Sequence, residues 1–162
     1  MITIGIDPGI EKVGIGIVSS DKGISKLVAK ELIHTSSKLK TPERLGIIFD
    51  RLNTILSLYN IDHASVEKLF FAKNTKTAMI VSEARGVVLL ALQLKNLPIF
   101  EYTPLQVKQS LIGYGRGEKS QIQSIVKMML KLDEIPKPDD VADAIALAIT
   151  HNNTYKFLSK IS

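Results

Sequence analysis

Four acidic side chains stand out in the sequence because each lies in or beside an apolar run. Asp7 closes an isoleucine-rich run directly before a Pro-Gly pair, and Glu67 lies inside the apolar stretch 66–69. Asp140 and Asp143 are three residues apart at the start of an otherwise apolar segment, so a helix would place them on one face, about 5–6 Å apart. An acid among apolar side chains is costly unless a cation or a hydrogen-bond donor meets it. All four are therefore candidates for function.

Each acid also has an ordinary structural explanation. Asp7 could cap the turn that follows it, and Glu67 could be an exposed residue of an edge strand. Asp139 is expected to be the N-cap of the last helix, where capping and the helix dipole explain an acid. The same effects explain Asp143 poorly, so Asp140 and Asp143 remain the functional candidates in that helix.

The acids gain significance if they converge. In a mixed sheet the strand that ends in Asp7 and the strand over 64–69 can lie side by side, which makes Asp7 and Glu67 neighbours beneath the last helix. Converging carboxylates repel one another unless divalent cations lie between them. Oxygen ligands without His or Cys suit Mg²⁺ or Mn²⁺, and paired metals about 3.5–4 Å apart are the usual device for phosphodiester cleavage. The pattern therefore indicates a nuclease with two Mg²⁺ ions, for which Mn²⁺ would substitute.

The composition excludes several other kinds of site. The chain has 162 residues, 45% of them hydrophobic, and no cysteine. Disulfides, zinc–thiolate sites, iron–sulfur clusters and cysteine nucleophiles are therefore excluded. Twenty-one Lys and Arg residues against sixteen Asp and Glu residues give a formal net charge of +5, which favours a polyanionic partner such as nucleic acid.

The hydrophobic pattern predicts an α/β fold. Three β-branched runs separated by turn residues predict an antiparallel meander over 2–7, 12–19 and 25–33. Capping residues before a proline, Thr41 and Thr103, predict the starts of two helices, the second of which is short and ends at Gly113. The other elements expected after the meander are strands over 64–69 and 98–102 and helices over 76–94, 118–132 and 139–151. This order predicts a mixed five-stranded sheet with helices on both faces.

No linker or repeat divides the chain, so we expect one domain over residues 1–153 and a short basic tail over 154–162. The N-terminus has neither a basic lead nor a long apolar stretch. The uncharged apolar stretch between Arg85 and Lys95 is half of the roughly 20 residues that a membrane span needs. We therefore expect no membrane association and a cytoplasmic location.

Two further features bear on nucleic-acid binding. Residues 113–117 are glycine-rich and contain Arg116, but their spacing matches neither a Walker loop nor a dinucleotide fingerprint. They form either a basic loop that touches a nucleic-acid backbone or a plain helix connection. Phe70 and Phe71 are adjacent, so a strand lets only one face the core, and the other could stack on an unpaired base. No ligand spacing relates the three histidines, His34, His63 and His151.

Six sequence blocks, taken in order, resemble those of the RuvC family of Holliday junction resolvases. The blocks are Ile4–Gly9, Glu67–Asn74, Ala84–Gly86, Tyr102–Gln109, Glu118–Ser120 and Asp140–Ala146. The resemblance covers nearly the whole chain. It implies a ribonuclease H-like fold, a homodimer, and metal-dependent symmetrical cutting of four-way DNA junctions.

The resemblance also implies roles for single residues. The family's metal-binding catalytic acids are similar in their motifs to Asp7, Glu67, Asp140 and Asp143. Lys108 and Lys119 resemble the basic residues that assist at the phosphate, and Phe70 resembles the ring placed at the junction centre. Lys73 and Arg116 are further candidates for substrate contact.

The resulting hypothesis is a Mg²⁺-dependent DNA endonuclease that resolves Holliday junctions in recombination and repair and leaves 5′-phosphate nicks. A related ribonuclease H-like nuclease acting on RNA or another branched nucleic acid is the alternative, since it would share the acids without needing a dimer. An ATPase of the sugar-kinase or actin type needs a second lobe that 162 residues cannot supply. A non-catalytic junction-binding module would gain nothing from four acids that repel DNA.

The helix over 76–94 is the expected dimer contact. Residues 87–92 are apolar on every side, and a helix on one face of a sheet needs only one apolar stripe. A second copy of the same helix is the expected cover, in a two-fold dimer. The helix therefore predicts a second copy of the chain as one partner. The resemblance to the RuvC family implies four-way junction DNA as another, with a branch-migration motor complex as a further candidate.

Overall fold

The computed structural model describes residues 1–68 and 75–158 and contains one mixed sheet of five strands in the order β3-β2-β1-β4-β5. The strands are β1 (Ile2–Asp7), β2 (Lys12–Asp21), β3 (Ile24–His34), β4 (His63–Glu67) and β5 (Ile99–Tyr102). β1, β2 and β3 are antiparallel, whereas β4 pairs in parallel with both β1 and β5. The predicted meander followed by parallel strands is confirmed.

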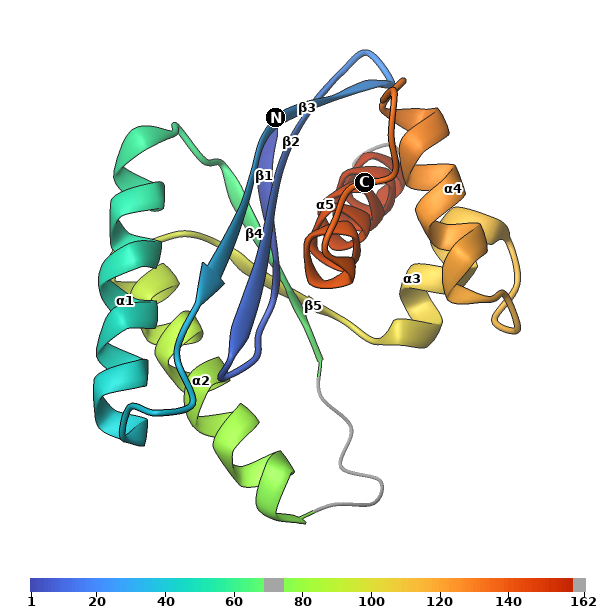
Figure 1. Cartoon of the computed structure of the whole chain (residues 1–162). Helices are drawn as coiled ribbons and strands as arrows, with labels where there is room; N and C mark the ends of the chain where they lie inside the picture. The colour runs from blue at the N-terminus through green and yellow to red at the C-terminus, as the bar shows by residue number, and fades with distance from the viewer. Residues whose placement is uncertain (69–74, 159–162) are drawn as a thin grey trace.

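Helices cover both faces of this sheet (Figure 1). On one face lie α1 (Thr41–Leu58) and α2 (Thr75–Leu94), and on the other lie α3 (Pro104–Ile112), α4 (Lys119–Met129) and α5 (Asp139–Leu158). One apolar core fills the space between the sheet and α1 and α2, and a second surrounds α5. Because β1 is covered on both faces, all of its residues from Thr3 to Ile6 are buried, as in other central strands.

α5 crosses β1 and β2 at close range because glycines face it. A Cβ atom at Gly5 would overlap the carbonyl oxygen of Ala144, and one at Gly14 would overlap the carbonyl oxygen of Asp140. Gly14 is also the cross-strand partner of Asp7. The close approach therefore brings the first turn of α5 to the end of β1, where Asp7 lies.

Helix starts follow the predicted capping chemistry only in part. Thr103 precedes α3, and its hydroxyl accepts a hydrogen bond from the Gln106 N–H at 3.1 Å. At α1 the prediction is off by one residue: Lys40, not Thr41, is the N-cap residue, and its N–H donates to the Glu43 carboxylate at 2.9 Å. That acid in the first turn takes the place of a capping side chain.

Both ends of α5 differ from the prediction. Asp139 is the first residue of the helix and not its N-cap, and its carboxylate accepts a hydrogen bond from Gln123 at 2.9 Å. The partner from α4 draws this side chain away from a capping role. The helix continues to Leu158, so the boundary expected at residue 153 falls inside α5.

α2 is apolar beyond what its own packing requires. Residues Thr77–Leu94 could cross a membrane by length and composition alone, but a single helix of this kind is weak evidence for a span. Ala84 and Val88 are buried, whereas 53% of Leu90 is exposed. One side of α2 therefore packs on the domain, and another leaves apolar side chains uncovered.

Candidate active site

Asp7 and Glu67 lie at the ends of two neighbouring parallel strands. Ile6 stands opposite Val66, so the next residue of each strand leaves the sheet at the same edge. The carboxyl groups of Asp7 and Glu67 lie close enough for a hydrogen bond between them, which contributes to the raised pKa of Asp7 and opposes the rise in that of Glu67. Two carboxyl groups can make such a bond only if one of them holds a proton. The predicted neighbourhood of Asp7 and Glu67 is thus present in the structure.

Burial and negative neighbours keep the proton on Asp7. Burial is the largest cause, and together with the charges of Glu67, Asp143 and Asp140 it raises the pKa of Asp7 to about 8. Burial also raises the pKa of Glu67, although the hydrogen bond from Asp7 and the charge of Lys119 oppose the shift. Strongly shifted carboxyl groups that lie together are typical of functional sites.

The second pair of acids comes from α5. The approach of this helix over Gly14 carries Asp140 and Asp143 toward Asp7, whose pKa both of them raise. Burial raises the pKa of Asp143 as well, although Lys119 lowers it by a hydrogen bond and by its charge. The structure therefore brings all four predicted acids into one electrostatic cluster.

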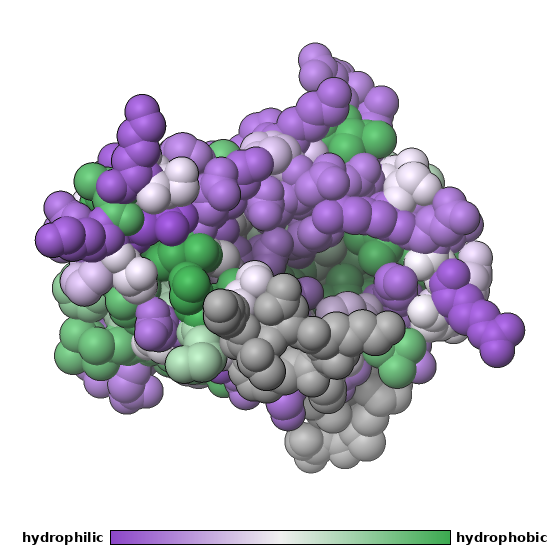
Figure 2. Space-filling view, turned by 60° about the horizontal axis from the view of Figure 1, so that its bottom comes forward, coloured by the Kyte–Doolittle hydropathy of each residue, from purple (hydrophilic) through white to green (hydrophobic). Residues whose placement is uncertain are grey.

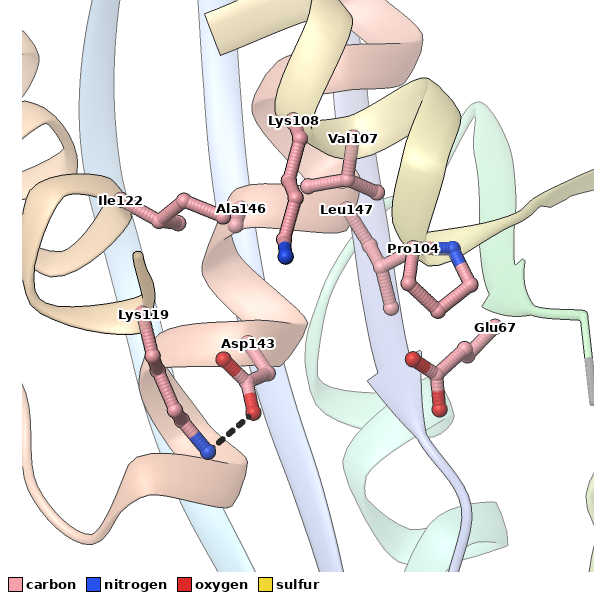
Figure 3. A pocket seen from close by; sticks show the side chains of 9 residues that line it. All are labelled: Glu67, Pro104, Val107, Lys108, Lys119, Ile122, Asp143, Ala146 and Leu147. Atoms are coloured by element: carbon pink, nitrogen blue, oxygen red, sulfur yellow. Dashed lines mark ion pairs between the residues drawn. The ribbon is translucent and has the colours of Figure 1, made fainter. Parts of the chain in front are cut away.

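Two lysines stand beside this cluster. Lys108 of α3 and Lys119 of α4 line a pocket of about 220 Å³ together with Glu67 and Asp143. The apolar part of its lining is Pro104, Val107, Ile122, Ala146 and Leu147. In Figure 3 the side chain of Lys108 extends into this pocket. Lys119 Nζ lies 2.9 Å from Oδ2 of Asp143 and 3.4 Å from Oδ2 of Asp139.

The surface at this end of the sheet is largely hydrophilic. Figure 2 shows polar side chains around a hollow with an apolar floor. The pocket lined by Lys108, Lys119, Glu67 and Asp143 can receive a phosphodiester while the lysines offset its charge.

The acids also suit a divalent cation by their chemistry. Within residues 1–68 and 75–158, no three His, Asp or Glu side chains already form a set that could hold a metal ion. Without a cation, the raised pKa of Asp7 keeps its carboxyl group protonated at neutral pH, and Lys119 pairs with Asp143. A hard divalent ion would displace that proton and relieve the repulsion among the carboxylates, so the donor set fits such an ion.

Three other predicted residues lie apart from the cluster or outside the described chain. Arg116 is exposed in the connection between α3 and α4 and does not line the pocket. Phe70 and Lys73 lie outside the described residues. The predicted contacts of these three residues with substrate remain untested predictions.

Sequence reasoning missed the partners of Arg85. Its Nε donates to the backbone carbonyl of Glu67 at 3.2 Å, and its guanidinium pairs with Glu101. The sequence pointed to a function for Arg85 only because the residue lies in the block Ala84–Gly86, which resembles the RuvC family. A bond to a backbone carbonyl leaves no pattern of its own in a sequence.

Two histidines were also missed. His63 Nδ1 lies 2.9 Å from His151 Nε2, and the hydroxyl of Tyr102 lies 2.9 Å from Nδ1 of the same His151. These hydrogen bonds attach α5 to β4 and β5. Since the two histidines are 88 residues apart, their spacing gave no indication of the contact.

The chain matches known proteins over nearly its whole length. The family model described as crossover junction endodeoxyribonuclease RuvC matches residues 3–151. The protein of that name from Alkaliphilus metalliredigens is 50% identical over 159 residues, which cover 98% of this chain and 97% of the relative. The one from Caldicellulosiruptor saccharolyticus is 53% identical over 152 residues, which cover 93% and 92%.

A solved structure of T. thermophilus RuvC in complex with a Holliday junction substrate superposes with a TM-score of 0.90 at 33% identity, over 97% of this chain and 96% of that chain. The expected ribonuclease H-like fold is thereby confirmed. Sequence identity and fold agree over the same span, and the four acids lie together within it. The chain belongs to the RuvC family of crossover junction endodeoxyribonucleases.

Proposed function

We propose that this protein is a structure-selective DNA endonuclease that resolves Holliday junctions by paired, symmetrical phosphodiester hydrolysis during homologous recombination and repair. The observation that carries the proposal is the cluster of four interacting acids beside a pocket lined by two lysines. Membership in the family and the junction complex of the T. thermophilus relative support the choice of substrate. The products would be nicks with 5′ phosphates that a ligase can seal.

The acids would hold the metal cofactor. Two Mg²⁺ ions, or Mn²⁺ in their place, would bind the carboxylates of Asp7, Glu67, Asp140 and Asp143. When bound, such ions supply the charge that activates an attacking water and stabilises the leaving 3′ oxygen. Asp7 must first release its proton, which its raised pKa retains at neutral pH.

The lysines would act on the phosphate. Lys108 extends into the pocket between the acids and α3, and Lys119 reaches the carboxylates of α5. Both ammonium groups would neutralise the scissile phosphate and the negative charge that grows on it during hydrolysis. Phe70 would stack on an opened base at the junction centre, and Lys73 and Arg116 would contact the DNA backbone.

We propose further that two chains form a homodimer through α2. Large apolar side chains of this helix are exposed, among them Met79 at 67%, Leu90 at 53% and Leu94 at 62%. Leu89 and Leu90 also line a shallow hollow with Ile99 of β5, which a second copy of the helix would fill. A four-way junction has approximate two-fold symmetry, so a two-fold dimer places one acid cluster at each of two strands of like polarity.

The remaining assignments follow from this role. We place the protein in the cytoplasm, where junction DNA is formed in bacteria, the source of the named relatives. A complex that drives branch migration is the partner class that would deliver junctions to it.

A synthetic four-way junction tests the proposal directly. The protein is incubated with the labelled junction with and without Mg²⁺, and the strands are separated on a denaturing gel. We expect cuts at symmetrical positions in two strands of like polarity, only with the metal, and products that a ligase joins. Intact strands in the presence of Mg²⁺ or Mn²⁺ would contradict the proposal, as would equal cutting of linear duplex of the same sequence.

Nucleases acting on RNA or other branched nucleic acids are the alternative, and the same assay separates them. An RNA–DNA hybrid, a three-way branch and a single-stranded flap are tested beside the junction at equal concentration. Faster cutting of any of these than of the junction would favour the alternative.

A further inference from the structure

The carboxylate of Glu67 is part of the acid cluster, but its backbone is held from the opposite face of the sheet. The carbonyl oxygen of Glu67 accepts a hydrogen bond from Nε of Arg85 at 3.2 Å. Arg85 lies in α2, which packs on the face of the sheet away from α5. One residue thus has its side chain in the site and its carbonyl bound to a helix on the other side.

A second bond orients the guanidinium. The Nη2 of Arg85 forms an ion pair with Oε1 of Glu101, a residue of β5. Val66 and Glu101 are register partners in the β4–β5 pair, so the acid stands beside the residue that precedes Glu67. The planar guanidinium can make both contacts at once, which a single ammonium group cannot do in the same way.

The burial of Arg85 separates this arrangement from a surface contact. Only 19% of its side chain is exposed, against 39% for Glu101. Burial lowers the pKa of Arg85, so the environment disfavours its charge unless partners compensate for it. A mostly buried arginine whose guanidinium already binds a carbonyl and a carboxylate is poorly placed to reach a DNA phosphate.

The bond from Arg85 to Glu67 lies where the strand pairing of β4 ends. Glu67 is the last residue of β4, and the Lys68 N–H donates to the Tyr102 carbonyl at 2.8 Å where the β4–β5 ladder ends. Beyond this point the sheet no longer fixes the backbone, and Arg85 supplies a holding contact there. A catalytic group displaced by about 1 Å can lose about 100-fold in rate.

We infer that Arg85 is a positioning residue for Glu67: its guanidinium, oriented by Glu101, fixes the Glu67 backbone so that the carboxylate stays beside Asp7. The inference rests on the proposed function, since it assigns Arg85 to the geometry of that site. Arg85 acts from behind the sheet and touches neither the reacting phosphate nor the pocket.

Substitutions at both ends of the contact test this role. Arg85→Gln removes the positive charge and the planar guanidinium. Arg85→Lys keeps the charge but has a single nitrogen to donate from. Glu101→Gln removes the ion pair and keeps the shape of the Glu101 side chain. Arg44→Gln is the matched control, because Arg44 Nε also holds a helix, α1, by a bond to Thr35 Oγ1 at 2.9 Å. Each variant is measured for single-turnover cutting of the junction, for junction affinity without metal, and for Mn²⁺ binding by the protein alone.

For Arg85→Gln we expect cutting to slow by about 10- to 100-fold and Mn²⁺ to bind more weakly, with junction affinity within about twofold of the wild type. Arg85→Lys should recover only part of the rate, because one ammonium group cannot hold Glu67 and Glu101 as the guanidinium does. Glu101→Gln should lose less than Arg85→Gln, and Arg44→Gln should cut and bind Mn²⁺ as the wild type does. Thermal denaturation identifies any variant that has not folded, and Arg85→Lys with Glu101→Gln then carry the test.

Two results would overturn the inference. The first is that Arg85→Gln folds, cuts and binds Mn²⁺ as the wild type does. If Arg85→Gln does not fold, the same result for both Glu101→Gln and Arg85→Lys would overturn the inference. The other is a loss of cutting matched by an equal loss of junction affinity, which would make Arg85 a DNA contact. Failure of the wild-type protein to cut the junction is a different outcome, because it would count against the proposed function itself.

Discussion

Lys119 Nζ lies 2.9 Å from Oδ2 of Asp143, so an ammonium group of α4 neutralises an acid of the cluster on α5. About half of the Lys119 side chain is exposed, at 51%, and the Asp143 side chain is 32% exposed. A pair this open to solvent adds little to stability. Its position next to the pocket gives the contact its significance, since the lysine can turn from the acid to a phosphate.

The first prediction concerns Lys119 and Lys108. Lys119→Ala and Lys108→Ala should each slow single-turnover cutting by about 10- to 100-fold, because a charge near the reacting phosphate is lost. Junction affinity should fall much less, since the other Lys and Arg residues of this basic chain would still contact the DNA backbone. Lys131→Ala, at an exposed position outside the pocket, is the control. A wild-type rate in either pocket variant would remove that lysine from the mechanism.

The second prediction concerns Asp7→Asn. The substitution keeps the shape of the side chain and removes a charge that the metal requires, so cutting should fall by about 1000-fold or more. Junction binding should be unchanged or tighter, because a negative charge near the phosphate is gone. Thermal stability should be unchanged or higher, since burial disfavours the charged form of Asp7. Asp133→Asn, an exposed acid, should change none of these, and a parallel loss of binding and cutting in Asp7→Asn would make Asp7 structural.

The third prediction concerns the glycine beneath α5. In Gly14→Ala the new Cβ would overlap the carbonyl oxygen of Asp140, so α5 must move away from β2. Overpacking of this kind costs about 1–3 kcal/mol of unfolding free energy, and cutting should fall because Asp140 and Asp143 move with the helix. Gly46→Ala is the control, since a Cβ at Gly46 in α1 would meet nothing within 4 Å. Wild-type stability and cutting in Gly14→Ala would show that the close approach is dispensable.

The sequence could predict the acid cluster because each part of it follows from local rules. Strand order puts the ends of β1 and β4 side by side, and a three-residue spacing puts Asp140 and Asp143 on one helix face. The partners of Arg85 and the His63–His151 contact could not be predicted in this way. They depend on how α2 and α5 are rotated about their axes, which only the packed structure determines.

The buried histidine leads to the fourth prediction. Burial, with the charge of His63 as a smaller cause, lowers the pKa of His151 from 6.5 to about 4. Between pH 6.5 and pH 4, His151 is therefore protonated in the unfolded chain but neutral in the folded chain. The contribution of His151 to the free energy of unfolding is lost as the pH falls through this range. At about 1.4 kcal/mol per pKa unit the loss approaches about 3 kcal/mol.

Unfolding of the wild type and of His151→Gln by urea, measured between pH 7 and pH 4.5, tests this directly. The variant has no imidazole at that position, so its stability should fall less over the same range. The acids of the site titrate in both proteins, and the comparison removes their contribution. Parallel pH profiles for the two proteins would show that His151 does not titrate as its burial requires.

The last prediction concerns Leu90 of α2. A glutamate at Leu90 would place a charge in the uncovered apolar surface of the helix, beside the hollow that Glu101 also lines. In a dimer formed through α2 that charge would be buried without a partner, which costs several kcal/mol in each of the two symmetry-related copies. Light scattering should therefore give about twice the chain mass of 17.8 kDa for the wild type and the single-chain mass for Leu90→Glu.

The control is Ile24→Glu, because Ile24 is 63% exposed at the start of β3, away from α2. This variant should remain a dimer and cut two strands of like polarity in the junction. Leu90→Glu should lose paired cutting while each chain keeps its acid cluster and still binds Mn²⁺. A wild-type protein that scatters as a single chain, or a Leu90→Glu variant that stays dimeric, would rule out the α2 interface.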